Sequence, residues 1–400
     1  MNGTLKTLLM MAMIASLVAC GDEGAGGGAQ VDPNNAPNNN PEPEGEPEGE
    51  PEGEPEDPGA CEQLEVPESP RALAVIYTDK NATDVSTYLS GFEGGRDELL
   101  GQVPVSLFSA DGERETSTCA DGRAAFGPLE DGVYLLSPQM PPGHCGTKNC
   151  ARRLPEAIRE GKVKIVTFGD SIPVVGDAPF FPERLAQLLS PLAEVEDKNV
   201  AIGGTTSETW LPGAGTFERR LAPELADADV VMISLGGNDV LGFVQANVAN
   251  LGNIDALVED VYVVVEQIVE NLLTIADAIR AINPDADLVY CLYPDYSLAV
   301  NNQMWSLVNQ FVGADIVHDV LVTARDSLPL EEDIILVDVF DASQGLPLDD
   351  YLFDSLHFND LGQNFYAQEI FKALGGVLVG PSPIDGDTPL GLDQQFSVSP

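Results

Sequence analysis

The sequence predicts an α/β fold in which a parallel sheet lies between two layers of helices, preceded by a small antiparallel β domain. Residues 161–378 alternate apolar, β-rich runs with amphipathic helical patterns. These runs are apolar at nearly every position, as strands covered by helices on both faces must be. Residues 61–150 instead hold short apolar runs separated by Gly, Asp and Pro, which is typical of antiparallel strands joined by turns.

Composition limits the classes of function. The 400 residues include 65 Asp and Glu against 19 Lys and Arg, a formal net charge of −46. This charge argues against nucleic acid as a partner, because phosphate backbones are bound by clustered cations. Hydrophobic residues make up 44% of the chain, enough to bury a sizeable core. No apolar run reaches the ~18 residues that a membrane-spanning helix needs.

Residues 1–20 have the pattern of an export signal. Lys6 precedes a 12-residue apolar stretch from Leu8 to Ala19 that only Ser16 interrupts. The stretch ends in LVAC at Cys20, which resembles the lipobox of bacterial lipoprotein signal peptides. The resemblance implies that Cys20 becomes the lipidated first residue of an exported protein, anchored at the cell envelope and facing the periplasm or the exterior. The alternative is an ordinary secretory signal with a chance cysteine.

Residues 21–60 are expected to form a disordered stalk. They consist mainly of Gly, Pro, Asn and Glu, and 44–56 repeat Glu-Gly-Glu-Pro with a period of four. Such a segment buries too little apolar surface to offset the entropy of ordering. Proline and charge repulsion favour an extended chain, which suits a spacer behind a lipid anchor.

The remaining cysteines agree with an oxidising compartment. Four of them precede the main domain and could form two disulfides, which we expect to pair Cys61 with Cys119 and Cys145 with Cys150. Two other pairings are possible for four cysteines. The fifth, Cys291, lies in an apolar run and is expected to be a free thiol in the core.

The predicted β domain at 61–150 has apolar runs at 72–77, 103–108 and 132–136. Within 103–108, the apolar side chains alternate with the period of two that a half-buried strand requires. The turns DGR at 121–123 and DGVY at 131–134 resemble those of transthyretin-like and carboxypeptidase-regulatory-like β-sandwich modules. We expect a structural spacer, with glycan or partner binding as the alternative.

In the main domain, strands are expected at 162–168, 229–235, 287–293 and 333–340, and a long amphipathic helix at 254–279. Residues 379–400 are expected to be a C-terminal tail. Chemistry in open parallel sheets gathers where the strands end at their carboxyl side. Candidate functional residues are therefore those that follow each strand.

Three motifs follow strands or lie near the end of the domain. Ser171 ends the run GDS at 169–171, directly after the first strand. Asn238 lies in GGND at 236–239, after another strand, where glycines permit a tight turn. Asp354 precedes His357 by three residues in DSLH, a spacing that places both side chains on one side of a turn. A helix-capping serine is the ordinary explanation of a lone GDS tripeptide.

Together these residues supply what acyl transfer requires. Ser171 would be the nucleophile, His357 the base that takes its proton, and Asp354 the group that fixes the imidazole tautomer. The oxyanion that develops on the substrate needs hydrogen-bond donors. The candidates are the backbone N–H of Ser171, the side-chain amide of Asn238 and a glycine N–H from the run AIGG at 201–204.

Residues 161–378 resemble the SGNH (GDSL) hydrolase superfamily, because four blocks occur in that family's order. They are GDS at 169–171, NVAIGGTT at 199–206, GGND at 236–239 and DSLH at 354–357. The resemblance implies a flavodoxin-like three-layer fold and places Gly204 at the glycine position of the oxyanion hole. The family often has proline after the catalytic histidine, whereas this chain has Phe358.

The sequence thus predicts an exported serine hydrolase that cleaves carboxylic esters through an acyl-enzyme, with no cofactor and no metal, as a monomer. Asn283, Asp285 and Asp287 imitate the start of a calcium loop, but Leu288 replaces its glycine and Pro294 its bidentate acid.

Alternative activities within the family are lysophospholipase and carbohydrate acetylesterase. An alternative from another class is a non-catalytic surface adhesion lipoprotein. Of the other histidines, His318 is expected to be an exposed helical residue with ordinary charged neighbours. His144 lies far along the chain from any nucleophile motif.

Overall fold

The computed structural model describes residues 73–76, 102–118, 123–126, 129–139, 151–247, 254–310, 318–319, 322 and 334–384. The predicted signal peptide and stalk lie outside these residues. So do His144, the four cysteines expected to form disulfides, and the tail beyond residue 384. Cys291 is buried as a free thiol, which confirms that prediction.

A parallel sheet of five strands forms the centre of the molecule. In spatial order the strands are β10 (Ile334–Val337), β9 (Asp287–Cys291), β8 (Val230–Ser234), β6 (Lys162–Gly169) and β7 (Glu194–Asn199). Numbered along the chain and read from β7, this order is 2-1-3-4-5, the flavodoxin-like arrangement. The predicted fold class is confirmed. From β6 the chain continues to β7 on one side of the sheet, and from β8 it continues to β9 on the other side. A ligand site is expected at the carboxyl ends of β6 and β8, where the strand order reverses.

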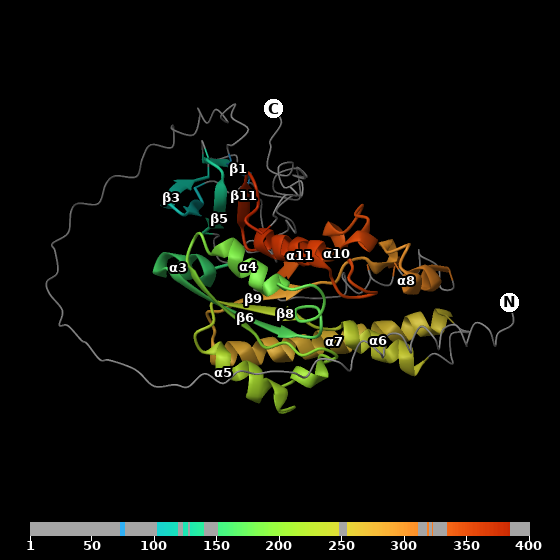
Figure 1. The fold of residues 1–400 in the computed structure, drawn as a ribbon. Helices are drawn as coiled ribbons and strands as arrows, with labels where there is room; N and C mark the ends of the chain where they lie inside the picture. The colour runs from blue at the N-terminus through green and yellow to red at the C-terminus, as the bar shows by residue number, and fades with distance from the viewer. Residues whose placement is uncertain are drawn as a thin grey trace, which may run out of the picture.

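Helices cover both faces of this sheet (Figure 1). Ile165 and Met232 belong to one hydrophobic core, and Val166 and Ile233 to the other, as the period of two along a strand requires. The first core includes α3 (Arg153–Glu160), α4 (Phe181–Leu189) and α11 (Asp360–Ala373). The second includes η3 (Phe217–Leu221), α5 (Ala222–Leu225) and α7 (Ile254–Ile282). Within the described ranges, no helix has the length and apolar character needed to cross a membrane.

Shorter elements follow the carboxyl ends of the strands and carry the site. They are η2 (Glu208–Trp210), α6 (Gly237–Ala246), η5 (Tyr296–Leu298), α8 (Gln303–Val308), α10 (Val339–Ala342) and η7 (Leu348–Tyr351).

The edge strand β7 has no apolar run and was not among the predicted strands. Its sequence is EVEDKN, and Glu196 pairs with Lys162 of β6 at 3.0 Å. Charged side chains on an edge strand discourage pairing with other chains, so a polar strand is suited to this position. The four predicted strands of the main domain correspond to β6, β8, β9 and β10, and the predicted helix to α7.

A second sheet is antiparallel, with the order β11 (Gly376–Val379), β5 (Gly132–Pro138), β2 (Pro104–Ser109) and β3 (Gly112–Ser117). A separate pair joins β1 (Leu73–Ile76) to β4 (Arg123–Phe126). Strand β11 follows α11 and comes from the end of the segment expected to form the hydrolase domain. The small sheet therefore combines strands from two distant parts of the chain.

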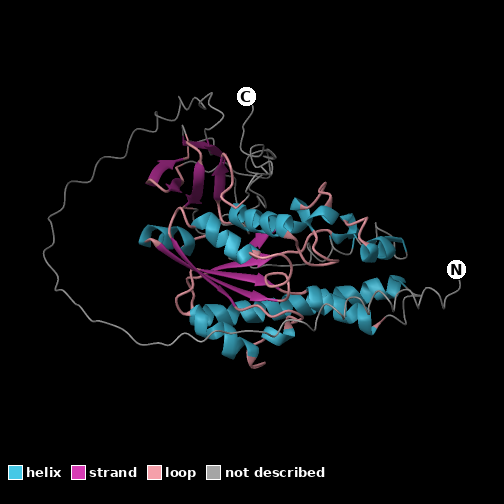
Figure 2. Cartoon of the chain, in the orientation of Figure 1, coloured by secondary structure: helices cyan, strands magenta, loops and turns pink. Residues whose placement is uncertain are grey.

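Both faces of β5, an inner strand of the small sheet, are buried. Val133 and Leu135 of β5 join the core that contains α3 and α11, whereas Tyr134 and Leu136 join a separate core with Phe126 of β4. Figure 2 shows the two sheets separated by helices. The small sheet thus packs on the main domain through a shared core.

Candidate active site

The motifs predicted to carry chemistry meet at the carboxyl ends of β6 and β8. Gly169 is the last residue of β6, with φ of 139°, and lies opposite Ser234. A Cβ atom on Gly169 would lie 1.9 Å from the carbonyl oxygen of Ser234, so only glycine fits here. This close approach brings the turn before Ser171 against the end of β8, which leads to Asn238.

Ser171, His357 and Asp354 form a continuous chain of hydrogen bonds. The Oγ atom of Ser171 lies 2.8 Å from Nε2 of His357, and Nδ1 of His357 lies 2.7 Å from Oδ2 of Asp354. The residues come from distant parts of the sequence, since Ser171 and His357 are 186 positions apart. The structure therefore brings together the three residues that the sequence motifs singled out.

Asp354 is positioned by its own turn. Its Oδ1 atom accepts hydrogen bonds from the backbone N–H groups of Leu356 and His357, at 2.7 and 2.8 Å. Burial alone would raise the pKa of Asp354, but the hydrogen bonds from the side chain and backbone of His357 and from Leu356 outweigh it, so the pKa lies below its ordinary value. An ionised carboxylate can only accept, so Nδ1 of His357 donates and Nε2 is left to accept the Ser171 proton.

Asn238 and the glycine loop, which were expected to complete the oxyanion hole with the N–H of Ser171, lie beside Ser171. Asn238 and Ser171 line the same pocket, and one hydrogen of the Asn238 amide is donated to the carbonyl of Thr205 at 2.9 Å. An amide has a second hydrogen to donate. In the glycine loop, Gly203 lies against Ser171, since a Cβ on Gly203 would be 3.7 Å from that of Ser171. Gly204, the glycine expected to donate to the oxyanion, is the next residue and adopts a φ of 78°.

Side chains that sequence reasoning missed hold this glycine loop in place. Asp239 accepts hydrogen bonds from the backbone N–H and the hydroxyl of Ser207, the latter at 2.7 Å. The Thr205 hydroxyl donates to the carbonyl of Gly169 or that of Ile202, each 2.9 Å away, and accepts from the indole N–H of Trp210. The loop is thereby fixed to α6 and to the end of β6. Asp239 and Thr205 lie in the motifs GGND and NVAIGGTT, whereas Ser207 and Trp210 lie outside the motifs.

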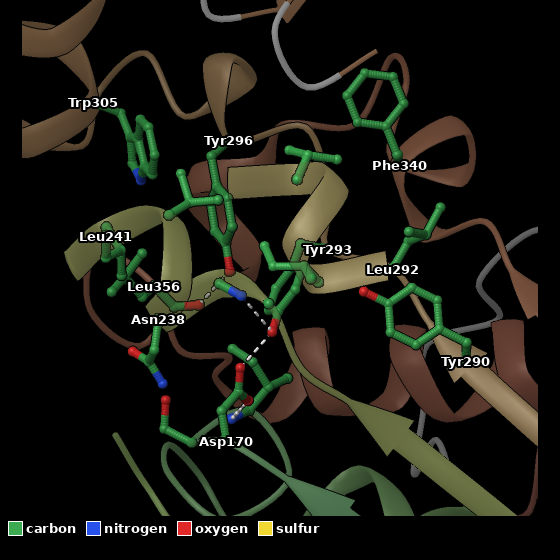
Figure 3. A pocket seen from close by; sticks show the side chains of 17 residues that line it. Asp170, Asn238, Leu241, Tyr290, Leu292, Tyr293, Tyr296, Trp305, Phe340 and Leu356 are labelled. Carbon is green, nitrogen blue, oxygen red and sulfur yellow. Dashed lines mark hydrogen bonds between the residues drawn. The ribbon is translucent and has the colours of Figure 1, made fainter. Parts of the chain in front are cut away.

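A second connection joins the two sides of the site. The hydroxyl of Tyr293 donates to Oδ2 of Asp170 and accepts from the backbone N–H of Gly237 at 3.0 Å. Figure 3 shows Tyr293 between Asp170 and the helix that carries Asn238. Burial raises the pKa of Asp170 to about 6, although hydrogen bonds from Tyr293, Ile172 and Ser234 oppose the rise. Tyr293 thus links the residue before Ser171 to the residue before Asn238.

A second histidine–carboxylate pair lies elsewhere in the fold. His318 was expected to have ordinary neighbours, but its Nδ1 lies 2.6 Å from Oδ2 of the fully buried Asp295. The Ser297 hydroxyl donates to the other oxygen of Asp295 at 2.6 Å. Here the carboxylate of Asp295 lies between the serine and the imidazole. In the relay at Ser171, the imidazole of His357 lies between the serine and the carboxylate. The Ser297 proton is directed at a carboxylate, a much weaker base than an imidazole, so this group lacks the serine–histidine contact that activates a nucleophile.

An apolar pocket of about 190 Å³ opens beside Ser171. Asp170, Ser171 and Asn238 line it where the motifs meet, and most of the remaining wall is aliphatic or aromatic. Figure 3 shows the labelled side chains around it, with Phe340 and Trp305 at the end away from Asp170. The site therefore combines a polar relay with a hydrocarbon surface.

Residues 167–365 match the family described as the GDSL-like lipase/acylhydrolase family. Comparison with curated proteins yields no match.

Solved structures similar to this chain include three hydrolases, each matched over 53% of this chain. The lipase Lip_vut3 from a goat rumen metagenome has a TM-score of 0.43 and 19% identity, over 98% of its own chain. Phospholipase A1 from Streptomyces albidoflavus NA297 has a TM-score of 0.39 and 18% identity, over 99% of its chain. The acetyl xylan esterase AlAXEase has a TM-score of 0.34 and 17% identity, over all of its chain.

Proposed function

Because residues 167–365 belong to the GDSL-like lipase/acylhydrolase family, we propose that the protein is a serine hydrolase that cleaves carboxylic esters through an acyl-enzyme. The observation that carries the proposal is the relay from Ser171 through His357 to Asp354, with heavy-atom distances of 2.8 and 2.7 Å. These are hydrogen-bond distances, as proton transfer between nucleophile and base requires.

In the first half of the reaction, Oγ of Ser171 attacks the ester carbonyl carbon while its proton passes to Nε2 of His357. The carbonyl oxygen becomes an oxyanion, which the amide of Asn238 and the backbone N–H groups of Gly204 and Ser171 would stabilise. The bond between the carbonyl carbon and the alcohol oxygen then breaks. His357 gives its proton to the departing oxygen, and the acyl group remains on Ser171.

In the second half, His357 takes a proton from water, and the resulting nucleophile attacks the acyl carbon. The bond to Ser171 Oγ breaks, the proton returns to that oxygen, and a carboxylic acid is released. Asp354 stabilises the imidazolium in both halves, because its carboxylate is ionised and bonded to Nδ1.

We also infer that the enzyme is exported and anchored at the cell envelope through a lipid on Cys20, with the hydrolase facing the periplasm or the exterior. The apolar stretch that ends in LVAC and the Pro- and Glu-rich segment after it support this location.

A fluorophosphonate probe tests the proposed chemistry on the full chain, because it forms a covalent bond only with an activated serine. We expect labelling of Ser171 in the wild type and none in Ser171→Ala. Ser297→Ala is the matched control, because Ser297 also lies beside an aspartate–histidine pair but donates to the aspartate. It should be labelled as strongly as the wild type. An unlabelled wild type would favour a non-catalytic binding lipoprotein.

A further inference from the structure

The pocket beside Ser171 is built to hold hydrocarbon. Its wall includes Leu241 of α6, Val265 and Ile268 of α7, and Leu292 after β9. Leu241 is half-buried, whereas Val265 and Ile268 are buried and part of the packed interior. Figure 3 shows Leu241, Leu292 and Phe340 around the same space.

The polar hydrogens of the aromatic residues in the pocket wall already form hydrogen bonds within the protein. The hydroxyl of Tyr290 donates to the carbonyl of Leu235 at 2.8 Å, and that of Tyr296 to the carbonyl of Leu356 at 2.7 Å. Tyr293 donates to Asp170, and the indole N–H of Trp305 to the carbonyl of Ser355 at 2.7 Å. A sugar hydroxyl in this pocket would lose water without gaining these donors, which is costly. A hydrocarbon chain meets no such penalty.

The volume sets the length of that chain. An apolar cavity of about 150 Å³ is known to admit benzene, a molecule of six carbons. The pocket beside Ser171 has about 190 Å³. An acetyl group would place a single methyl in it, whereas a chain of roughly six to ten carbons would fill it and its open mouth.

The position of His357 indicates whether the acyl half or the alcohol half of the ester enters the pocket. Ser171 and Asn238 line the pocket, but His357 does not. The general acid must reach the oxygen of the departing alcohol, so the alcohol lies on the His357 side, outside the pocket. The group that remains bonded to Ser171 lies on the side of Asn238 and the pocket.

We propose that this pocket binds the acyl chain of medium-chain esters, of about six to ten carbons, and that the enzyme prefers these to acetyl esters. The inference rests on the proposed function and specifies its substrate class. The alcohol is held outside the pocket and is less strictly selected.

Two isomeric esters test whether the pocket binds the acyl chain or the alcohol chain of the substrate. Ethyl octanoate and octyl acetate contain the same atoms, but the long chain is on the acyl half of the first and on the alcohol half of the second. We expect the full chain to hydrolyse ethyl octanoate at least tenfold more efficiently, measured as kcat/KM. Faster hydrolysis of octyl acetate would place the alcohol in the pocket and overturn the proposal.

A series of p-nitrophenyl esters measures the length limit with a constant leaving group. Each methylene buried in the pocket should raise kcat/KM about fourfold, up to roughly six to ten carbons, after which it should fall. Acetate as the best substrate, with turnover that depends on Ser171, would overturn this inference alone. No turnover that depends on Ser171 with any ester would overturn the proposed function as well.

Two substitutions in the wall should shift this limit in opposite directions. Leu241→Trp narrows the pocket and should move the optimum to shorter chains. Phe340→Ala enlarges the end away from Asp170 and should move the optimum to longer chains. Val263→Trp is the control, because Val263 is 62% exposed on α7 and does not line the pocket. An unchanged optimum in a folded Leu241→Trp variant would contradict the assignment.

Discussion

Asp354 shows how much of the site depends on one side chain. One of its oxygens holds the turn through the N–H groups of Leu356 and His357, and the other holds the imidazole. The hydrogen bonds that form the turn also keep the carboxylate ionised, because they lower its pKa. The spacing of three residues between acid and histidine is thus sufficient to build the pair locally, and a short motif could predict it.

Asn238→Ala removes a donor that acts on charge present only in the transition state. We expect kcat to fall about 10²–10³-fold, with KM nearly unchanged. Steady-state kinetics on a soluble ester measure both constants. Gln245→Ala, at the other end of α6, should leave them unchanged. A variant that mainly raised KM would make Asn238 a residue that binds substrate in its ground state.

Tyr293→Phe removes the hydroxyl that bridges Asp170 and the N–H of Gly237. Ser171 and Asn238 then lose a common support, and we expect kcat to fall about tenfold while KM changes little. The control is Tyr290→Phe, because Tyr290 lies in the preceding strand and donates to the carbonyl of Leu235 instead. Equal kcat losses in the two variants would mean that Tyr293 has no special positioning role.

At the scale of elements, the start of β9 holds the start of α3. The carboxylate of Asp287 accepts hydrogen bonds from the backbone N–H groups of Arg152 and Leu154, both at 2.8 Å. It thereby satisfies donors that a helix N-terminus leaves unpaired. Burial raises the pKa of Asp287 to about 6, although these bonds oppose the rise. The residue that imitates part of a calcium loop in the sequence is therefore a helix cap in the structure.

This cap predicts a pH dependence of stability. The pKa of Asp287 is higher in the folded than in the unfolded state, so the folded state binds more protons between about pH 4 and 6. The contribution of this group to the free energy of unfolding should fall by roughly 3 kcal/mol as the pH rises through that window.

Urea unfolding of the wild type and Asp287→Asn, from pH 4 to 7, measures the change as a difference between the two proteins. The exposed Asp285→Asn is the control for the loss of charge. A constant difference between wild type and Asp287→Asn across the window would contradict the assignment.

The elements differ in how well the sequence predicted them. Strands β6, β8, β9 and β10 are apolar because both of their faces are covered, and such runs are visible in the sequence. The edge strand β7 and the mostly exposed β3 lack this signal. The pairing of β11 with β5 joins residues more than 230 positions apart, which no local pattern encodes. Motifs in the sequence marked Ser171, His357 and Asn238. No local pattern marked Tyr293, because its partners Asp170 and Gly237 are distant in the sequence.

At the scale of the whole molecule, the small sheet and the site occupy different ends of the structure. Arg159, near the end of the helix that leads into β6, pairs with Glu113 of β3 at 2.7 Å. The small sheet therefore contacts the end of α3 that leads into the amino end of β6, whereas Ser171 follows the carboxyl end of β6. Figure 1 shows this separation, with β3 and β5 near α3, and α6 and α8 at the other end. Strand β1, the described element closest in sequence to the predicted anchor, is paired with β4.

The predicted anchor can be tested independently of the chemistry. We expect the mature wild type to partition into detergent and Cys20→Ala to remain in the aqueous phase, because the variant cannot be acylated. Hydrolysis of a soluble ester should be the same for both proteins, since Cys20 is no part of the site. Equal partitioning of the two proteins into detergent would contradict lipidation at Cys20.

In the proposed mechanism, Ser171 carries the acyl group between the two halves of the reaction. Rapid acid quenching of the full chain during turnover of p-nitrophenyl octanoate, followed by mass spectrometry of its peptides, measures this most directly. We expect an octanoyl adduct on the peptide that contains Ser171, and neither adduct nor turnover in Ser171→Ala. Wild-type turnover with the acyl group on another residue, or undiminished turnover by Ser171→Ala, would contradict it.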